Sequence, residues 1–274
     1  MKKMALMLVL FFSVQASAYV FEFKQLNGDQ YRIVTTSFQN FFSDNTKVTS
    51  FDHGYKAVLR VTDVVNKTAS IKGQYFYMAK VVGEEGAYKV MEDNIYESEF
   101  TRTPDGKMEV GQKFFYPVVR NLPVFPQKDI KIGEAWESTG IESQDFRKLG
   151  IPNPFLVPFE VRYQYLRDEN YKGKDCAVIS VFYYMNKRFR TGLAPYKKPK
   201  FPVNVKGFFK GLIYWDKKTG DMFTFEGNYE FIYIMSDGEI REWEGKDSGE
   251  LTVIREAKEE EKKLHEDAKK EIGK

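Results

Sequence analysis

The chain has 274 residues, of which 42% are hydrophobic, 30% are charged and 16% are aromatic, so it can build a sizeable core. Ten Pro and 20 Gly exclude a collagenous or low-complexity chain, and 24 Phe with 17 Tyr argue against disorder. Two His and one Cys cannot complete a zinc site unless carboxylates are recruited, so no metal or other cofactor is expected.

Residues 1–18 predict a signal peptide. Lysines at positions 2 and 3 precede an apolar run at residues 4–14, and Ala16-Ser17-Ala18 is a small-x-small cleavage pattern, so we expect cleavage before Tyr19. The apolar run is shorter than the roughly 20 residues of a membrane-spanning helix, and no later stretch comes near that length. The mature chain is therefore expected to be exported, to lack a transmembrane span and to meet no nucleic acid.

Alternation of apolar and polar residues with a period of two dominates residues 19–254 and predicts antiparallel strands. The first hairpin is expected between residues 19–24 and 31–36. Asn27-Gly28 lies between them and can supply the positive-φ pair that a tight turn needs.

A second hairpin is predicted by the same alternation. Residues 56–64 place Ala57, Leu59 and Val61 on one face, and residues 71–77 continue the pattern on the return strand. Asn66-Lys67 is expected to form the turn between them.

The clearest alternation is at residues 221–235, where aromatic side chains share one parity. Gly227 interrupts this aromatic face and predicts a bulge or a sharp bend, because glycine has no side chain to pack. Asp237-Gly238 should then turn the chain, and residues 240–254 should return beside the long strand.

Such long strands favour a curved antiparallel sheet, a half-barrel or a barrel, and no amphipathic helix is expected within residues 19–250. All ten prolines fall between residues 104 and 202, where we expect strand edges and loops because proline has no N–H to donate. Residues 19–254 are therefore interpreted as one all-β domain with a loop-rich centre.

Residues 255–274 are almost wholly charged and predict a short helical tail or connector. Glu259 and Lys263, like Glu266 and Lys270, have the i, i+4 spacing that supports an exposed helix. The apolar stripe of this segment is thin, so a docking helix and a solvated tail are both open.

No specific catalytic motif is present in the sequence, and no catalytic residue is predicted. Glu84-Glu85 and Glu92-Asp93 are carboxylate pairs that chance explains in a chain with 39 acidic residues. His53, in Asp52-His53-Gly54, is expected in a turn, with its ring satisfied or exposed. Cys176 cannot form an intramolecular disulfide, and a small buried side chain is a better interpretation than a reactive thiol.

One segment of the chain is strongly basic, although the formal net charge of the whole chain is only +3. From Cys176 to Trp215 there is no acidic residue. This segment predicts a surface for an anionic partner such as a lipid headgroup, a glycan phosphate or an acidic protein, unless the acids of residues 237–250 cover it. The candidate residues are Lys187, Arg188, Arg190, Lys197, Lys198 and Lys200.

Several strings in the chain resemble the N-terminal β domain of the OmpA-family envelope proteins of spirochaetes. They include YVFEFKQLNGDQYRIVTT at residues 19–36, PVVRNLPVFP at 117–126, KIGEAW at 131–136, GLIYWDKKTG at 211–220 and Ser236-Asp237-Gly238. The resemblance covers nearly all of the mature chain and implies a location in the periplasm or at the periphery of the outer membrane. It assigns no catalytic residue, and the peptidoglycan-binding domain that follows in the family has no counterpart here.

Three classes of function remain after these exclusions. The first is a non-enzymatic structural or interaction module of the cell envelope, with envelope proteins or anionic lipid or glycan as partners. The second is a carrier that holds an apolar or lipidic ligand against the concave aromatic face of the sheet. An enzyme is a distant third. An integral outer-membrane barrel would fit the aromatic strands but not the prolines in the centre of the chain.

Overall fold

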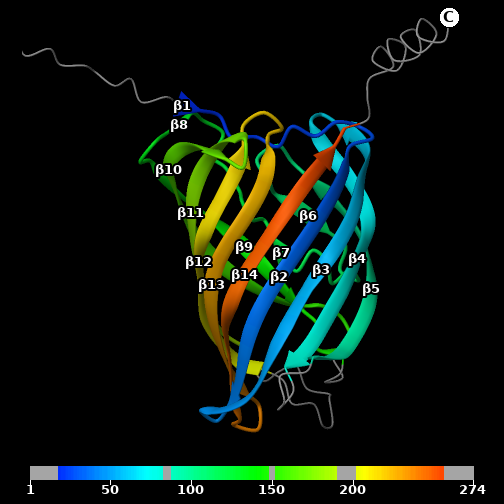
Figure 1. The fold of residues 1–274 in the computed structure, drawn as a ribbon, viewed down its shortest axis with the longest axis vertical. Coiled ribbons are helices and arrows are strands. Elements are labelled where there is room, and N and C mark those ends of the chain that lie inside the picture. Colours follow the sequence, from blue (N-terminus) through cyan, green and yellow to red (C-terminus); the bar gives the residue numbers. More distant parts are fainter. Residues whose placement is uncertain (1–17, 83–87, 148–151, 190–201, 256–274) are drawn as a thin grey trace, which may run out of the picture.

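The computed structural model describes residues 18–82, 88–147, 152–189 and 202–255, apart from the side chains of residues 82 and 88–94. These residues form strands and loops with no α-helix, which confirms the all-β prediction. Twelve strands build one nearly closed antiparallel sheet with the shape of a barrel (Figure 1). The strands are β1 (Ala18–Tyr19), β2 (Gln30–Ser43), β3 (Thr46–Val65), β4 (Thr68–Val82), β5 (Tyr88–Arg102), β6 (Met108–Val110), β7 (Val119–Arg120), β8 (Ile130–Lys131), β9 (Ala135–Gln144), β10 (Phe155–Tyr171), β11 (Lys174–Arg188), β12 (Pro202–Asp216), β13 (Asp221–Met235) and β14 (Ile240–Ile254).

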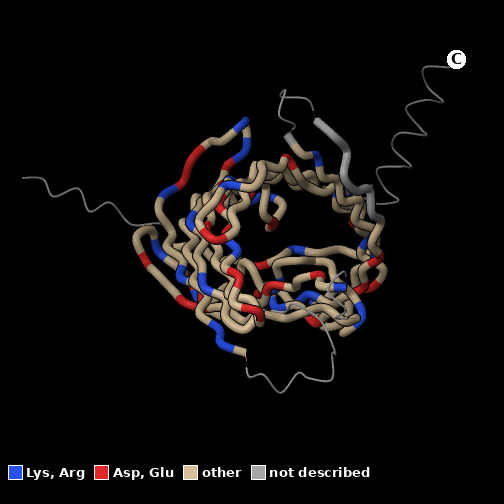
Figure 2. The backbone as a smooth tube through the Cα atoms, turned by 90° about the horizontal axis from the view of Figure 1, so that it is seen from below, with Lys and Arg blue, Asp and Glu red and all other residues tan. Residues whose placement is uncertain are grey.

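The strand order around the sheet is β6-β5-β4-β3-β2-β14-β13-β12-β11-β10-β9-β7, while β1 and β8 form a separate pair. The first and the last long strands, β2 and β14, pair along their whole lengths. That pairing merges the N-terminal and C-terminal strands into one wall. Seen along the long axis, the wall forms a ring in which basic and acidic residues are interspersed (Figure 2).

Residues 111–118 close the gap between the two edge strands, β6 and β7. The Ser98 hydroxyl of β5 donates a hydrogen bond of 2.6 Å to the carbonyl of Tyr116. The backbone N–H of Ser143 in β9 donates one of 2.7 Å to the carbonyl of Val118. The connecting segment therefore takes the place of a strand and joins β5 to β9.

A large cluster of buried aromatic and aliphatic side chains packs inside the barrel. Inward-facing residues alternate with outward-facing ones, so Val161 and Tyr163 of β10 are 1% and 0% exposed whereas Arg162 between them is exposed. Trp215 is fully buried, and its ring lies 4.8 Å from that of Phe125, centroid to centroid. The interior around this cluster has the close packing of a protein core.

Residues 20–29 do not form the strand of the predicted first hairpin. They cross the upper end of the barrel, where the N–H of Phe23 bonds to the carbonyl of Pro104 at 2.8 Å. The alternating aromatic residues Phe21 and Phe23 still enter the core, and Phe23 lies 4.9 Å from Trp215, ring centroid to centroid. Residues 20–29 therefore form a cap over the barrel, with their alternating aromatic residues in the core. β2 pairs with β3 and β14 and not with this segment.

The other two predicted hairpins are confirmed. Asn66 and Lys67 have φ angles of 49° and 66°, and they connect β3 to β4 as expected. Gly238 has a φ of 90° in the turn between β13 and β14. The two strands of the second hairpin extend beyond the predicted ranges, because polar residues near the ends of β3 and β4 also pair.

Gly227 is not a bulge, contrary to the sequence prediction. It pairs in continuous register with Gly211 of β12 and Asp247 of β14, and the β12–β13 register shifts elsewhere. A Cβ at Gly227 would lie 2.3 Å from Cζ of Phe209. The glycine therefore provides space for an aromatic ring on the inner face, a role that alternation alone does not reveal.

Among the prolines that the structure describes, Pro158 departs from the prediction that prolines mark edges and loops, since it lies inside β10. At this position β10 pairs with β9 through Ile141, whereas its pairing with β11 begins only at Glu160. The strand therefore has one partner where the N–H is missing, as for an edge strand. Residues 1–17 of the predicted signal peptide (residues 1–18) and residues 256–274 of the predicted tail (residues 255–274) lie outside the described residues.

Candidate functional site

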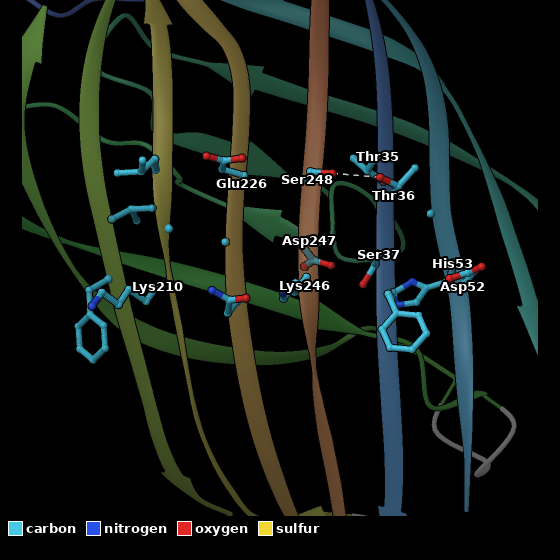
Figure 3. A pocket seen from close by; sticks show the side chains of 18 of the residues that line it. Thr35, Thr36, Ser37, Asp52, His53, Lys210, Glu226, Lys246, Asp247 and Ser248 are labelled. Atoms are coloured by element: carbon cyan, nitrogen blue, oxygen red, sulfur yellow. Dashed lines mark hydrogen bonds between the residues drawn. The ribbon is translucent and has the colours of Figure 1, made fainter. Parts of the chain in front are cut away.

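A recess of about 1200 Å³ runs across the strands on the outer face of the barrel (Figure 3). It extends from β10 through β11, β12, β13, β14, β2 and β3 to β4, at mid-height of the wall. Because side chains alternate between the two faces, residues at equivalent register positions of neighbouring strands form rows across the sheet. Two such outward rows line the recess: Phe182, Lys210, Asn228, Lys246, Phe38, Asp52 and Lys80 in one, and Ser180, Leu212, Glu226, Ser248, Thr36, Gly54 and Met78 in the other.

Part of the second row consists of residues with small side chains, which leave space in the recess. Thr36 and Ser248 face each other across β2 and β14, with their hydroxyl oxygens 3.0 Å apart. Gly54 continues the row on β3, where a Cβ would lie 2.1 Å from the carbonyl oxygen of Thr35. A glycine is therefore required at this position, and it leaves that part of the surface without a side chain.

Longer side chains of the first row border the recess. Phe182 on β11 and Phe38 on β2 are each 44% exposed, which is high for phenylalanine. Lys80, Lys210 and Lys246 are exposed and form no ion pair within the described residues. The border therefore offers aromatic surface and free ammonium groups to a molecule that lies across the strands.

The structure describes part of the predicted anionic-partner surface. Lys187 and Arg188 are exposed at the lower end of β11, whereas Arg190, Lys197, Lys198 and Lys200 lie outside the described residues. Lys206 and Lys210, which belong to the same acid-free segment, face outward on β12.

The acids of the last hairpin do not form ion pairs with these cations within the described part of the chain. β13 separates β12 from β14, so Lys206 and Lys210 lie opposite Ile232 and Asn228. Glu239 is paired with Arg241 in its own hairpin, and Glu250 is paired with Lys172.

Sequence reasoning noted Phe189, Tyr196 and Phe201 among the basic residues but missed Phe182, Tyr184 and Phe208. Phe182 and Tyr184 have the outward parity in β11, and they are 44% and 47% exposed. Phe208 lies opposite Tyr184 on β12, and its ring centroid is 6.4 Å from that of Phe182. The signal was present in the sequence, because these two strands have aromatic residues at both odd and even positions. Tyr183 and Phe209 occupy the inward positions, so their aromatic neighbours must face outward.

Two carboxyl groups occupy inward positions of the wall. Burial raises the pKa of Glu142 on β9 to about 7 and that of Asp247 on β14 to about 6. Each carboxylate receives a side-chain hydrogen bond, from Gln144 and Ser37 respectively, which opposes the shift. No cation is paired with either group within the described residues, so this region is polar and electrostatically costly.

His53 is not in a turn, contrary to the prediction. It lies within β3, faces the interior, and pairs in register with Ser37 of β2. Burial lowers its pKa to about 4, although Asp52 opposes this effect. Its Nε2 is buried and has no hydrogen-bond partner among the described residues, so the ring is neutral and unsatisfied rather than poised as a base.

Cys176 is fully buried, which confirms the interpretation as a small apolar side chain. It packs beside Val178 and Tyr214 on the outer side of the sheet. Burial raises its pKa to about 11, so the thiol is not activated as a nucleophile. The side chains of Glu84-Glu85 and Glu92-Asp93 lie outside the described part.

The part of the chain that the structure describes contains no group of His, Cys, Asp or Glu side chains arranged to hold a metal ion. It also contains no helix that is long and apolar enough to cross a membrane. No protein-family model matches the chain, and no curated protein matches it significantly.

Proposed function

We propose that this protein is a non-enzymatic interaction module of the cell envelope that binds its partner on the outer face of the barrel. The export signal and the resemblance to the β domain of OmpA-family envelope proteins support a periplasmic or outer-membrane-associated location. The observation that carries the proposal is the recess, because most of its lining residues belong to the outward rows of the wall.

The packed interior argues for this function over the carrier. Trp215, Tyr163 and Tyr165 are 0% exposed and fill the space that an apolar ligand would need. A carrier encloses most of its ligand in a concave, mostly apolar pocket. The aromatic inner face of this barrel is instead used for packing side chains against each other.

Polar groups on the inner face also make a poor environment for an apolar ligand. The carboxyl groups of Glu142 and Asp247 and the imidazole of His53 occupy inward positions. An apolar ligand beside them would further desolvate three polar groups without supplying hydrogen bonds, which is unfavourable. Polar groups in this region are therefore evidence for the module and against a lipid carrier.

Titration with a fluorescent long-chain fatty acid tests the proposal. Because the interior is packed, the purified mature chain should show no saturable uptake at one probe per protein. Saturable binding that changes the fluorescence of the buried Trp215 and Trp136 would support the carrier and contradict the module. A Phe182→Asn variant controls for probe adsorbed on the outer face, since that residue is exposed.

A further inference from the structure

Two exposed aromatic side chains and one half-buried one form a patch on the outer face of β11 and β12. Phe182 and Tyr184 are nearly half exposed, and Phe208 lies directly opposite Tyr184 on the neighbouring strand. The rings of Phe182 and Phe208 are 6.4 Å apart with an interplanar angle of 24°, so they present a stacked apolar surface. Contiguous exposed apolar surface of this kind commonly marks a contact site.

Basic side chains surround this aromatic patch. Arg162 lies opposite Phe182 on β10, Lys210 lies opposite Phe182 on β12, and Lys206 is two residues from Phe208. Arg188 continues the outward row at the lower end of β11, and Lys187 is exposed beside it. None of these five groups forms an ion pair within the described residues.

Acidic residues beside the patch do not balance these charges. Glu160 lies opposite Tyr184, and Glu230 lies opposite Phe208. Glu137 lies opposite Arg162 on β9, so five cations against three acids leave an excess of two positive charges around the rings. The nearest acids of β14 are separated from β12 by a whole strand, or about 10 Å across the sheet.

We propose that the patch of Phe182, Tyr184 and Phe208, with Arg162, Lys206, Lys210, Lys187 and Arg188 around it, docks the protein on an anionic lipid surface. This inference rests on the proposed function and names the partner of the outer face. Unpaired cations are attracted to anionic headgroups, and each cation that lies near the membrane surface contributes to the binding free energy. Exposed aromatic rings then enter the interface between headgroups and acyl chains, where their apolar bodies are favoured.

The combination of rings and cations favours a lipid surface over a soluble polyanion. A polyanion needs the cations alone, and exposed phenylalanine rings would lower the solubility of the free protein without improving its binding. A membrane interface uses both, since the charges attract the protein and the rings anchor it. The expected association is peripheral and sensitive to salt.

Co-sedimentation with vesicles tests the inference. The mature chain should bind vesicles of phosphatidylcholine with phosphatidylglycerol, should be released by high salt or carbonate, and should not bind phosphatidylcholine alone. Reversal of two cations in Lys206→Glu/Lys210→Glu should weaken binding by at least about 30-fold, since each basic residue near the surface contributes about 1 kcal/mol. Phe182→Asn/Tyr184→Asn should also weaken binding while keeping the charge constant.

Arg32→Glu/Lys56→Glu is the matched control, because it makes the same change in net charge at exposed positions of β2 and β3. Its binding should stay within about twofold of the parent, and circular dichroism should show that all variants are folded. Equal losses in the control, no binding by the parent, or resistance to carbonate would overturn the inference. Binding of inorganic polyphosphate that competes with vesicles and ignores the aromatic substitutions would identify a polyanion site instead and also overturn it. None of these results would revive the carrier, which the fatty-acid titration tests separately.

Discussion

The ring of Phe209 occupies the space in which a side chain at Gly227 would lie. A Cβ at Gly227 would be 2.3 Å from Cζ of Phe209, well inside van der Waals contact. The same relationship recurs at Gly140 with Phe159 and at Gly249 with Phe225. Glycines on the inner face therefore allow aromatic rings of the same or neighbouring strands to fill the barrel interior.

Gly227→Ala is predicted to destabilise the fold by about 1–3 kcal/mol, the usual cost of overpacking a well-packed core. Chemical denaturation would show this as a lower midpoint with an unchanged slope. Phe209→Leu should recover part of the loss when combined with Gly227→Ala, because it shortens the clashing ring. Strictly additive effects in that double-mutant cycle would contradict the proposed contact.

The ion pair between Arg102 and Asp221 links β5 to β13 beneath the N-terminal cap. Their closest atoms are 3.4 Å apart, and the side chains are 8% and 3% exposed. The Arg102 guanidinium also donates to Gln25 at 2.9 Å and lies over the ring of Phe23 at 4.1 Å. Burial raises the pKa of Asp221, so its charge depends on this arginine for compensation.

Arg102→Met is accordingly predicted to destabilise the protein by about 3–5 kcal/mol, because Asp221 would be left buried without a cation. Adding Asp221→Asn to Arg102→Met should restore much of the stability by removing the uncompensated charge. Thermal unfolding of both variants at neutral pH measures the effect. A double variant no more stable than Arg102→Met alone would show that the pairing is not what stabilises this region.

Glu142 makes the stability of the barrel depend on pH. Its pKa rises from an ordinary value of 4.5 to about 7, so the folded protein binds this proton more tightly than the unfolded chain. The resulting contribution is fully present below about pH 4.5 and is lost as the pH rises through about 7. His53 has the opposite sign, since its lowered pKa favours folding as the pH rises from about 4 to 6.5.

Glu142→Gln should therefore be more stable than the parent at pH 8, by up to about 3 kcal/mol, and close to it at pH 4. The His53 contribution cancels in this comparison because both proteins contain it. Glu137→Gln is the matched control, since Glu137 is exposed on the same strand and should leave the pH profile unchanged. A stability difference that does not vary with pH would refute a raised pKa at Glu142.

Much of the sheet was predictable because alternation and turn residues are local signals. Residues 56–64 and 71–77, with positive φ angles at Asn66 and Lys67, form the predicted hairpin. The cap at residues 20–29 was not predictable, because Phe21 and Phe23 alternate as a strand would. β2 pairs with β14, which lies far away in the sequence, as well as with β3. It therefore has no free edge with which residues 20–29 could pair.

The basic residues near the candidate site could be recognised in the sequence, but the recess could not. Lys187 and Arg188 of the acid-free segment are exposed, but the recess depends on register across eight strands. Gly54 and Ser248 are 194 residues apart in the chain, and no local pattern brings them into one row. The same limit applies to His53, whose turn-like neighbours Asp52 and Gly54 lie within a strand.

Native mass spectrometry of the protein isolated after export tests the central claim most directly. If the barrel is an interaction module with a packed interior, the measured mass should be that of the mature polypeptide alone, and organic extraction should release no stoichiometric lipid. A polypeptide that retains one apolar molecule per chain, removable by extraction, would contradict the account and identify the protein as a carrier.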